Sequence, residues 1–240
     1  MLKEISIDTK IHAFYKSHGI QTDKTFFGKE TRVNGSSALF IDRYSVGKSP
    51  GKAKYSPYEV DYKSIMIGLY QSGIDKVISV NMCGSLQKEI PPDSLVLIRD
   101  FIDFVNRDLT IDDQGLEIAD MSRPFDPQLS NLIKKSAELE KIQIFDGITY
   151  ILCVDGSRLE TPAEINFLKS VFKKDLVAGM EVPTEAQLAK LLNIKYAALG
   201  LVTNYATGLR EGPITQTSIE GSFEKAVPTI KKLIFGLIKL

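Results

Sequence analysis

Two hydrophobic patterns alternate along most of the chain. Short runs rich in Val, Ile, Leu and Ala predict strands that are buried on both faces. These runs are residues 38–42, 76–80, 94–98, 148–154, 175–179 and 196–203. Longer segments place apolar residues at helical spacing and predict helices. These segments are residues 57–72, 127–139, 162–172, 184–192 and 218–237.

Strands that alternate with helices indicate an α/β fold. We expect one domain over residues 1–240, with a twisted mixed sheet flanked by helices in three layers. Pro127 and Pro162 suit the first turn of a helix, whereas Pro228 predicts a start or kink within the last helix. The turn-rich stretch 44–57 predicts a long mobile loop.

Charge and composition narrow the classes of partner. The chain has 30 basic and 30 acidic residues, so no basic excess favours nucleic acid and no charged tail favours a membrane surface. Its two histidines stand near no cysteine, so no metal motif is present, and Cys83 and Cys153 suit buried thiols. Without a signal-peptide pattern or a long apolar run, a cytoplasmic protein that binds a small molecule or another chain is expected.

Four predicted strands end in polar or glycine-containing segments. Ligands of such sheets bind beyond the carboxyl ends of the strands. The segments are residues 81–85 (NMCGS), 155–160 (DGSRLE), 179–181 (GME) and 203–205 (TNY). Each one alone also suits a turn or a helix cap. Together they predict a pocket with convergent hydrogen-bonding groups.

The side chains at these ends suit the edge of a 6-oxopurine. The carboxylate of Glu160 can accept a hydrogen bond from N1–H, and the amide of Asn204 can serve O6 and N7. Met180 and Leu159 would pack against the flat ring.

Ordered motifs resemble one known family. The segment 156–164 (GSRLETPAE) is similar to the GPRFETPAE signature of the trimeric purine nucleoside phosphorylases and methylthioadenosine phosphorylases. Further similar segments follow the same order, from about residue 38 to the C-terminus. They are 81–86 (NMCGSL), 92–97 (PDSLVL), 101–103 (FID), 124–125 (PF), 179–180 (GM) and 202–208 (VTNYATG).

This resemblance implies a phosphorylase/hydrolase-like fold and cleavage of purine nucleosides with inorganic phosphate as co-substrate, to base and ribose 1-phosphate. It implies no metal or organic cofactor, and a homo-oligomer that is a trimer or a dimer of trimers. Glu160 falls where the family binds N1–H, and Asn204 falls at the catalytic position that binds N7. This pair favours 6-oxopurines over adenine, including 5′-methylthio-type nucleosides. Met82 lies in a loop that matches the family's substrate pocket.

The phosphate-holding half departs from the family. Residues 1–37 hold no GGSG-type loop, and 34–37 (NGSS) is a weak match. Arg43 is retained as a phosphate-binding residue, but the histidines that accompany it in the family are missing. Glu181 replaces the expected Ser or Thr, and a carboxylate there would repel phosphate. Ile118 stands near the place of a histidine that crosses a subunit interface in the family.

Three hypotheses follow. Phosphate is held by Arg43 with help from lysines of the mobile loop, which are Lys48, Lys52 and Lys54. Alternatively, Glu181 binds ribose hydroxyls and water replaces phosphate, although Glu181 also suits the start of a helix. Finally, the chain is an inactive purine-binding or structural paralogue. Tyr58 either walls the sugar pocket or is a surface aromatic.

Overall fold

The computed structural model describes residues 5–17, 20–33, 36–48, 54–111, 118–172 and 175–240. The strands are β1 (Ile5–Ser17), β2 (Ile20–Val33), β3 (Ser36–Phe40), β4 (Lys76–Ser85), β5 (Leu95–Asp103), β6 (Ile144–Leu152), β7 (Leu176–Ala178) and β8 (Lys195–Tyr205). The helices are α1 (Tyr62–Gln71), α2 (Pro127–Glu140), α3 (Pro162–Val171), α4 (Val182–Leu191) and α5 (Gln216–Ile238), with a 3₁₀ turn, η1, at Arg43–Ser45. In the predicted loop 44–57, residues 49–53 lie outside the described part.

Five strands form the centre of the molecule as a closed ring in the order β4-β7-β6-β5-β8. The pairs β4–β8, β5–β6 and β6–β7 are parallel, whereas β4–β7 and β5–β8 are antiparallel. This confirms the mixed sheet that the strand and helix patterns predict. The carboxyl ends of β4 and β8 meet, since Gly84 pairs with Asn204.

The central strands are buried on both faces, as their apolar runs predict. Leu95 and Leu97 of β5 join one cluster of buried side chains, while Val96 and Ile98 join another. Successive side chains of a strand point to opposite faces, so a strand covered on both sides needs apolar residues at both sets of positions.

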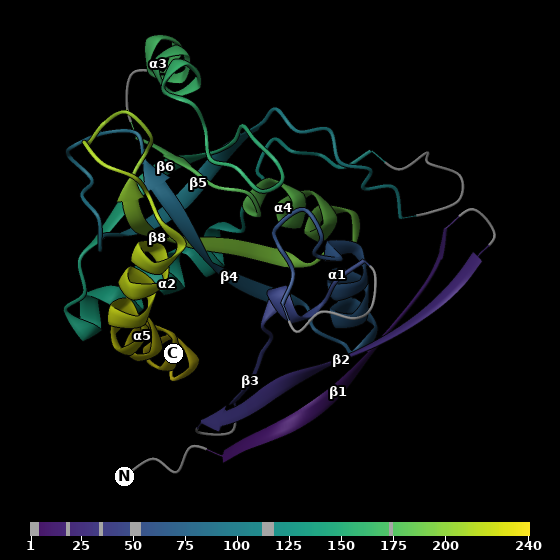
Figure 1. Ribbon diagram of the computed structural model, residues 1–240. Coiled ribbons are helices and arrows are strands. Elements are labelled where there is room, and N and C mark those ends of the chain that lie inside the picture. Colours follow the sequence, from purple (N-terminus) through teal and green to yellow (C-terminus); the bar gives the residue numbers. More distant parts are fainter. Residues whose placement is uncertain (1–4, 18–19, 34–35, 49–53, 112–117, 173–174) are drawn as a thin grey trace.

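Helices cover the strands on opposite sides (Figure 1). On one side α2 packs against α5, and both contact β8. On the other side α4 contacts α1 and the strands β5, β6 and β8. Pro127 and Pro162 begin their helices as predicted. Pro228 lies inside α5, which begins two residues before the predicted start.

The N-terminal strands were not predicted beyond the run at 38–42. Strands β1 and β2 form a long antiparallel hairpin that continues into β3 and passes along α1 at the edge of the body (Figure 1). Ile5, Ile7 and Ile11 alternate with polar residues, and this period of two would have predicted β1. No helix in the described part of the chain is long and apolar enough to cross a membrane.

Candidate functional site

Glu160 lies in the segment that joins β6 to α3, and the start of α3 fixes its position. The side chain of Thr161 accepts a hydrogen bond from the backbone N–H of Glu164, whose carboxylate accepts one from Thr161 N. Arg158 donates to both carboxylate oxygens of Glu164, at 2.8 and 2.9 Å. This capping box orders the chain on both sides of Glu160.

The carboxylate of Glu160 is buried, and no other described residue hydrogen-bonds it. The residue is only 7% exposed, and burial is the main reason that its pKa lies above the ordinary value. The backbone N–H of Glu160 itself donates to this carboxylate and lowers its pKa. A carboxylate with no donor from another described residue can still accept hydrogen bonds from a ligand.

A hollow of about 270 Å³ adjoins this carboxylate. We call it the Glu160 pocket; its lining residues are Leu159, Glu160, Tyr205, Ala206, Thr207, Gly208, Arg210, Gly212, Pro213 and Ile214. A Cβ added at Gly208 would lie 3.2 Å from Cβ of Pro162. The chain after β8 thus packs closely on the start of α3.

Asn204 is half-buried at the end of β8, next to the residues that line the Glu160 pocket. Its amide nitrogen donates to the carbonyl of Tyr205 at 2.9 Å, and its amide oxygen accepts from the hydroxyl of Thr203 at 2.8 Å. The predicted partners thus come from two segments that meet at this pocket. Glu160 lines the pocket, whereas Asn204 does not line it and precedes the lining residue Tyr205 in the chain.

Glu181 is the residue before α4, and its carboxylate points into the core. Tyr44 donates to one carboxylate oxygen and Tyr150 to the other, both at 2.8 Å. Tyr150 approaches so closely that a Cβ at Gly179 would lie 1.9 Å from its hydroxyl oxygen. The side chain of Glu181 makes no capping hydrogen bond to α4, so it does not act as a side-chain helix cap.

Arg43 belongs to a closed ring of buried polar side chains, which we call the Arg43 ring. Arg43 donates to the amide oxygen of Asn81 at 2.7 Å and pairs with the carboxylate of Glu185 at 3.0 Å. Asn81 donates to Ser79 at 2.8 Å, and the hydroxyls of Ser79 and Tyr196 are 2.6 Å apart. Tyr196 donates to Glu185 at 2.7 Å, which completes the ring.

The ring is electrostatically coupled. Burial opposes the charged form of Arg43, but the carboxylate of Glu185, with other groups around it, holds the pKa of Arg43 above its ordinary value. Burial is also the main reason that the pKa of Glu185 is raised, against the lowering effect of Arg43. Arg43 is thus already paired with a carboxylate where the sequence predicted phosphate.

Arg107, which no sequence motif singled out, connects the segment that carries Glu160 to helix α4. Its guanidinium donates to both carboxylate oxygens of Asp155, at 2.6 and 3.1 Å, and to the hydroxyl of Thr184 at 2.7 Å. Asp155 begins the segment that carries Glu160, and Thr184 lies in the first turn of α4. The guanidinium also lies 5.2 Å from the ring centre of Tyr62.

The remaining predicted residues differ in their surroundings. Met82 and Met180 are half-buried, whereas Tyr58 is 39% exposed and Ile118 is 95% exposed. Of the loop lysines, Lys48 donates to the carbonyl of Tyr58, and Lys54 pairs with Asp42 at 3.7 Å. Lys52 and residues 34–35 of the weak NGSS match at 34–37 lie outside the described residues.

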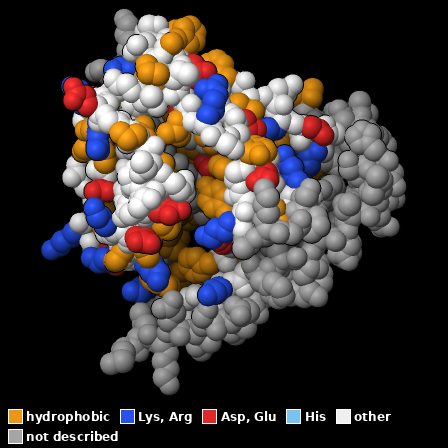
Figure 2. Space-filling model, in the orientation of Figure 1, with side chains coloured by type: hydrophobic (Ala, Val, Ile, Leu, Met, Phe, Trp, Pro, Cys, Tyr) orange, Lys and Arg blue, Asp and Glu red, His pale blue; other side chains and the backbone are white. Residues whose placement is uncertain are grey.

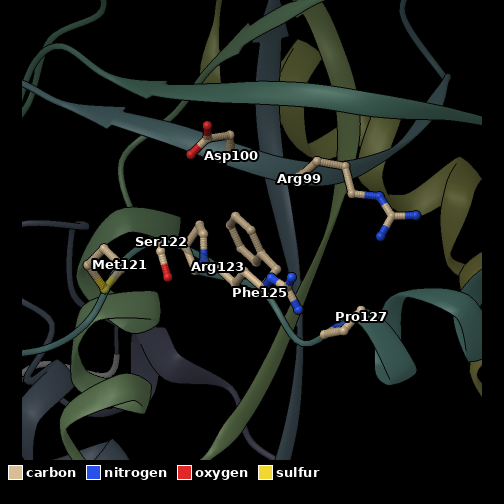
Figure 3. A pocket seen from close by; sticks show the side chains of 8 residues that line it. Arg99, Asp100, Met121, Ser122, Arg123, Phe125 and Pro127 are labelled. Carbon is tan, nitrogen blue, oxygen red and sulfur yellow. The ribbon is translucent and has the colours of Figure 1, made fainter.

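A second hollow, of about 290 Å³, lies near the opposite end of β8. Figure 3 shows Arg99 and Asp100 leaving β5 in different directions beside the loop of Ser122, Arg123 and Phe125. The backbone of this loop bonds to Tyr196, eight residues before Asn204, which is roughly 25 Å of strand. The second hollow is therefore separate from the predicted strand ends.

The described residues on the face seen in Figure 2 form no large patch of one charge. Lys and Arg side chains are interspersed with Asp and Glu side chains over the face seen in Figure 2, in keeping with the formal net charge of zero. Among the described residues, no group of three or more His, Cys, Asp and Glu side chains could hold a metal ion.

Comparison with known proteins places this arrangement in a family. The profile of the Phosphorylase superfamily matches residues 60–239. The chain belongs to the phosphorylase superfamily. A probable 6-oxopurine nucleoside phosphorylase of Dictyoglomus turgidum is 33% identical, with 85% of this chain and 76% of the relative aligned. A probable S-methyl-5′-thioinosine phosphorylase of Thermodesulfovibrio yellowstonii is 31% identical, with 92% and 83% aligned.

Solved structures of the phosphorylase superfamily share the fold. The methylthioadenosine phosphorylase of Schistosoma mansoni in complex with adenine has a TM-score of 0.78 at 20% identity, covering 89% of this chain and 80% of that one. A methylthioadenosine phosphorylase from an Antarctic soil metagenomic library has a TM-score of 0.77 at 22% identity, covering 89% and 74%. The family and the fold class predicted from the motifs are thereby confirmed.

Several buried polar residues of this superfamily member were not predicted. Glu185 is the clearest case, because it is 6% exposed in a helix that is otherwise largely buried. A charged residue among Val182, Ala186 and Ala189 on a buried helix is a sequence signal for a paired carboxylate. Tyr150 and Tyr196 had no comparable signal, since aromatic residues are common in buried strands.

Proposed function

We propose that this chain cleaves the N-glycosidic bond of purine nucleosides with inorganic phosphate, giving the free base and ribose 1-phosphate, and that it favours 6-oxopurines. Membership of the phosphorylase superfamily supports the reaction class. Two relatives are named for phosphorylases that act on 6-oxopurine nucleosides and on S-methyl-5′-thioinosine. The observation that carries the base preference is the buried carboxylate of Glu160, which borders a pocket and has no hydrogen bond from another described residue.

Base selection follows from the hydrogen-bonding needs of Glu160. Hypoxanthine and guanine carry a hydrogen on N1, which the ionised carboxylate accepts. Adenine has no hydrogen on N1, so its N1 offers the buried carboxylate a second acceptor in place of a donor. A site built to hydrogen-bond a polar edge rejects strongly the analogue that lacks it. Leu159 lines the same pocket and offers an apolar contact for the ring.

Bond cleavage develops positive charge on the sugar and negative charge on the departing purine. The amide of Asn204 donates to N7 of the purine as that charge develops, which is electrostatic stabilisation of the transition state. In the structure this amide donates to the carbonyl of Tyr205. An amide nitrogen carries two N–H groups, so this bond leaves a second N–H to donate to the purine.

Arg43 is the proposed phosphate ligand, and the reaction as proposed needs no metal or organic cofactor. Met180 and Met82 flank the nucleoside, Glu181 contacts the ribose, and Tyr58 borders the sugar. We also expect a cytoplasmic homo-oligomer, a trimer or a dimer of trimers. Sedimentation analysis of the purified chain tests its assembly.

Hydrolysis is the second candidate, and one observation favours it. Arg43 is already paired with Glu185, so water rather than phosphate is the nucleophile if that pair never opens. A catalytically inactive, purine-binding paralogue is the third outcome. The phosphate dependence of base release separates these possibilities.

The test measures free base released from inosine, guanosine and S-methyl-5′-thioinosine, with and without phosphate, using adenosine and methylthioadenosine for comparison. Release that requires phosphate and favours the 6-oxopurines supports the proposal. Equal release without phosphate replaces it by hydrolysis, and a preference for adenosine refutes the role of Glu160. Asn204→Ala should lower kcat about 100-fold, with a smaller effect on base affinity.

A further inference from the structure

The Arg43 ring leaves one edge of the arginine open. Arg43 donates from Nη1 to Asn81 and from Nη2 to the carbonyl of Val80, and Nη1 also forms the ion pair with Glu185. No described residue hydrogen-bonds Nε. An oxyanion has a donor to approach, because a guanidinium carries five N–H groups in a planar fork.

The negative charge of nearby carboxylates opposes the binding of an anion at Arg43, although a hydrogen-bond donor is present. Glu185 pairs with Arg43, and Glu181 is a second carboxylate that acts on the pKa of the same guanidinium. Both glutamates are buried, at 6% and 4% exposed. Two carboxylates around one guanidinium leave an excess of one negative charge when all three are ionised. A phosphate would add to that excess in a poorly solvated place.

We propose that Glu185 competes with phosphate for Arg43, so that phosphate binds with uptake of a proton that neutralises Glu185. This inference rests on the proposed role of Arg43 in phosphorolysis. Protonated Glu185 no longer offsets the charge of Arg43, which can then attract the anion through its open Nε edge. Glu185 is thereby a residue that sets phosphate affinity and is not itself a phosphate ligand.

The groups around Glu185 favour this residue as the proton acceptor. They are Arg43 from η1, Tyr196 from β8, Glu181 from the start of α4 and Tyr62 from α1. Burial is the largest effect and leaves the pKa of Glu185 raised even before an anion binds. Arg43 and the hydroxyl of Tyr196 lower that pKa, and Glu181 adds a smaller raising effect. An added anion raises it further, because a like charge disfavours the ionised carboxylate.

Glu181 is held by partners other than Arg43. Both of its carboxylate oxygens accept hydrogen bonds from tyrosine hydroxyls, one from Tyr44 and one from Tyr150. Glu185 depends most on Arg43, whose charge is the largest effect that lowers its pKa, ahead of the hydrogen bonds from the hydroxyls of Tyr196 and Ser79. When phosphate takes over Arg43, Glu185 loses the larger share of what keeps it charged.

The test is calorimetric titration with sulfate and with phosphate, on the wild-type chain and on Glu185→Gln. Sulfate keeps the same charge between about pH 5 and about pH 8, so its binding reports the protein's own protons. Titration in two buffers of different ionisation enthalpy counts the protons taken up. We expect about one proton per sulfate for the wild-type chain near pH 8. Glu185→Gln should bind sulfate about tenfold more tightly or better, with no proton uptake.

A matched variant controls for the loss of any carboxylate. Asp146 pairs with Arg99 at 2.6 Å on the surface, and Asp146→Asn should leave sulfate affinity unchanged. If Glu185→Gln does not fold, the pH dependence of sulfate binding to the wild-type chain decides alone. That affinity should fall about tenfold for each unit of rising pH above the pKa of Glu185.

The inference is overturned if Glu185→Gln binds sulfate no more tightly than the wild-type chain, if neither binds it, or if wild-type affinity does not change with pH. These results are separate from the fate of the proposed function. Phosphate-dependent release of base with an unchanged anion affinity in Glu185→Gln refutes the inference alone. Absence of any base release refutes the proposed function, while the sulfate titration still tests the competition at Arg43.

Discussion

The Glu160 pocket and the Arg43 ring both contain buried carboxylates, but they differ in how these are satisfied. Glu160 has no hydrogen bond from another described residue, and it lines a hollow. In the Arg43 ring, Glu185 accepts from Tyr196 and pairs with Arg43. The first region is a hydrogen-bonding set that a ligand completes. In the second the charge of Arg43 already has an internal partner, so an anion that approaches Nε has to compete with Glu185 for that charge.

This difference predicts distinct effects of ligands on the two regions. Base binding at Glu160 adds hydrogen bonds without breaking an ion pair. Anion binding at Arg43 exchanges one ion pair for another and gains only the difference in free energy. Arg107 bonds to the segment that carries Glu160 and to α4, which carries Glu185. We therefore expect the largest effect when Arg107 is replaced.

Replacement of Arg107 should cost the most stability. Arg107→Met leaves Asp155 and Thr184 without their shared donor, and we expect the free energy of unfolding to fall by about 3 kcal/mol. Urea denaturation measures it. Arg99→Met is the matched control, because Arg99 makes a similar two-bond pair with Asp146 but at the surface, where about 1 kcal/mol or less is expected. Equal losses of unfolding free energy in the two variants would show that Arg107 stabilises the fold no more than a surface ion pair does.

Removal of the charge at Glu160 should have the next largest effect, and on binding rather than folding. Glu160→Gln keeps the shape but turns a carboxylate into an amide, so we expect hypoxanthine affinity to fall about 10- to 100-fold. Stability should stay level or rise, since burial holds the pKa of Glu160 above its ordinary value and the charge is costly there. Calorimetry with hypoxanthine measures the change, with Asp146→Asn as control. If Glu160→Gln binds hypoxanthine as tightly as the wild-type chain, the carboxylate of Glu160 is not a hydrogen-bonding group that the base completes.

The smallest effect concerns the capping box beside the pocket. Arg158 and the N–H of Thr161 hold the pKa of Glu164 down at about 2. Because this pKa is depressed, the stabilisation is present above the ordinary pKa of a glutamate and is lost as the pH falls through about 2. Glu164→Gln should therefore cost about 1 kcal/mol near neutral pH, since the pair faces water.

Unfolding of Glu164→Gln and of the wild-type chain at several pH values checks this prediction. The difference between them should shrink as the pH falls from about 5 towards 2. A constant difference would mean that the box stabilises α3 through shape alone, and that the position of Glu160 depends little on charge.

The fold was predictable where side-chain periodicity and turn residues agree. The apolar runs predicted β4, β5, β6, β7 and β8, with ends that differ by up to five residues, and proline positions predicted the starts of α2 and α3. The hairpin β1–β2 was missed, although its alternating pattern is visible in the sequence. Half of the candidate site was predictable as well, because Glu160 and Asn204 stand at strand ends in motifs that resemble a family.

What the sequence by itself determined is the family, the α/β architecture and the two strand ends that carry Glu160 and Asn204. What only the tertiary structure decided is which charges neutralise each other. Arg43 and Glu185 are 142 positions apart and meet because Arg43 bonds to β4, while α4 contacts β8, which pairs with β4. Local periodicity reports which face of an element is buried, but a pairing between distant buried charges depends on how whole elements pack.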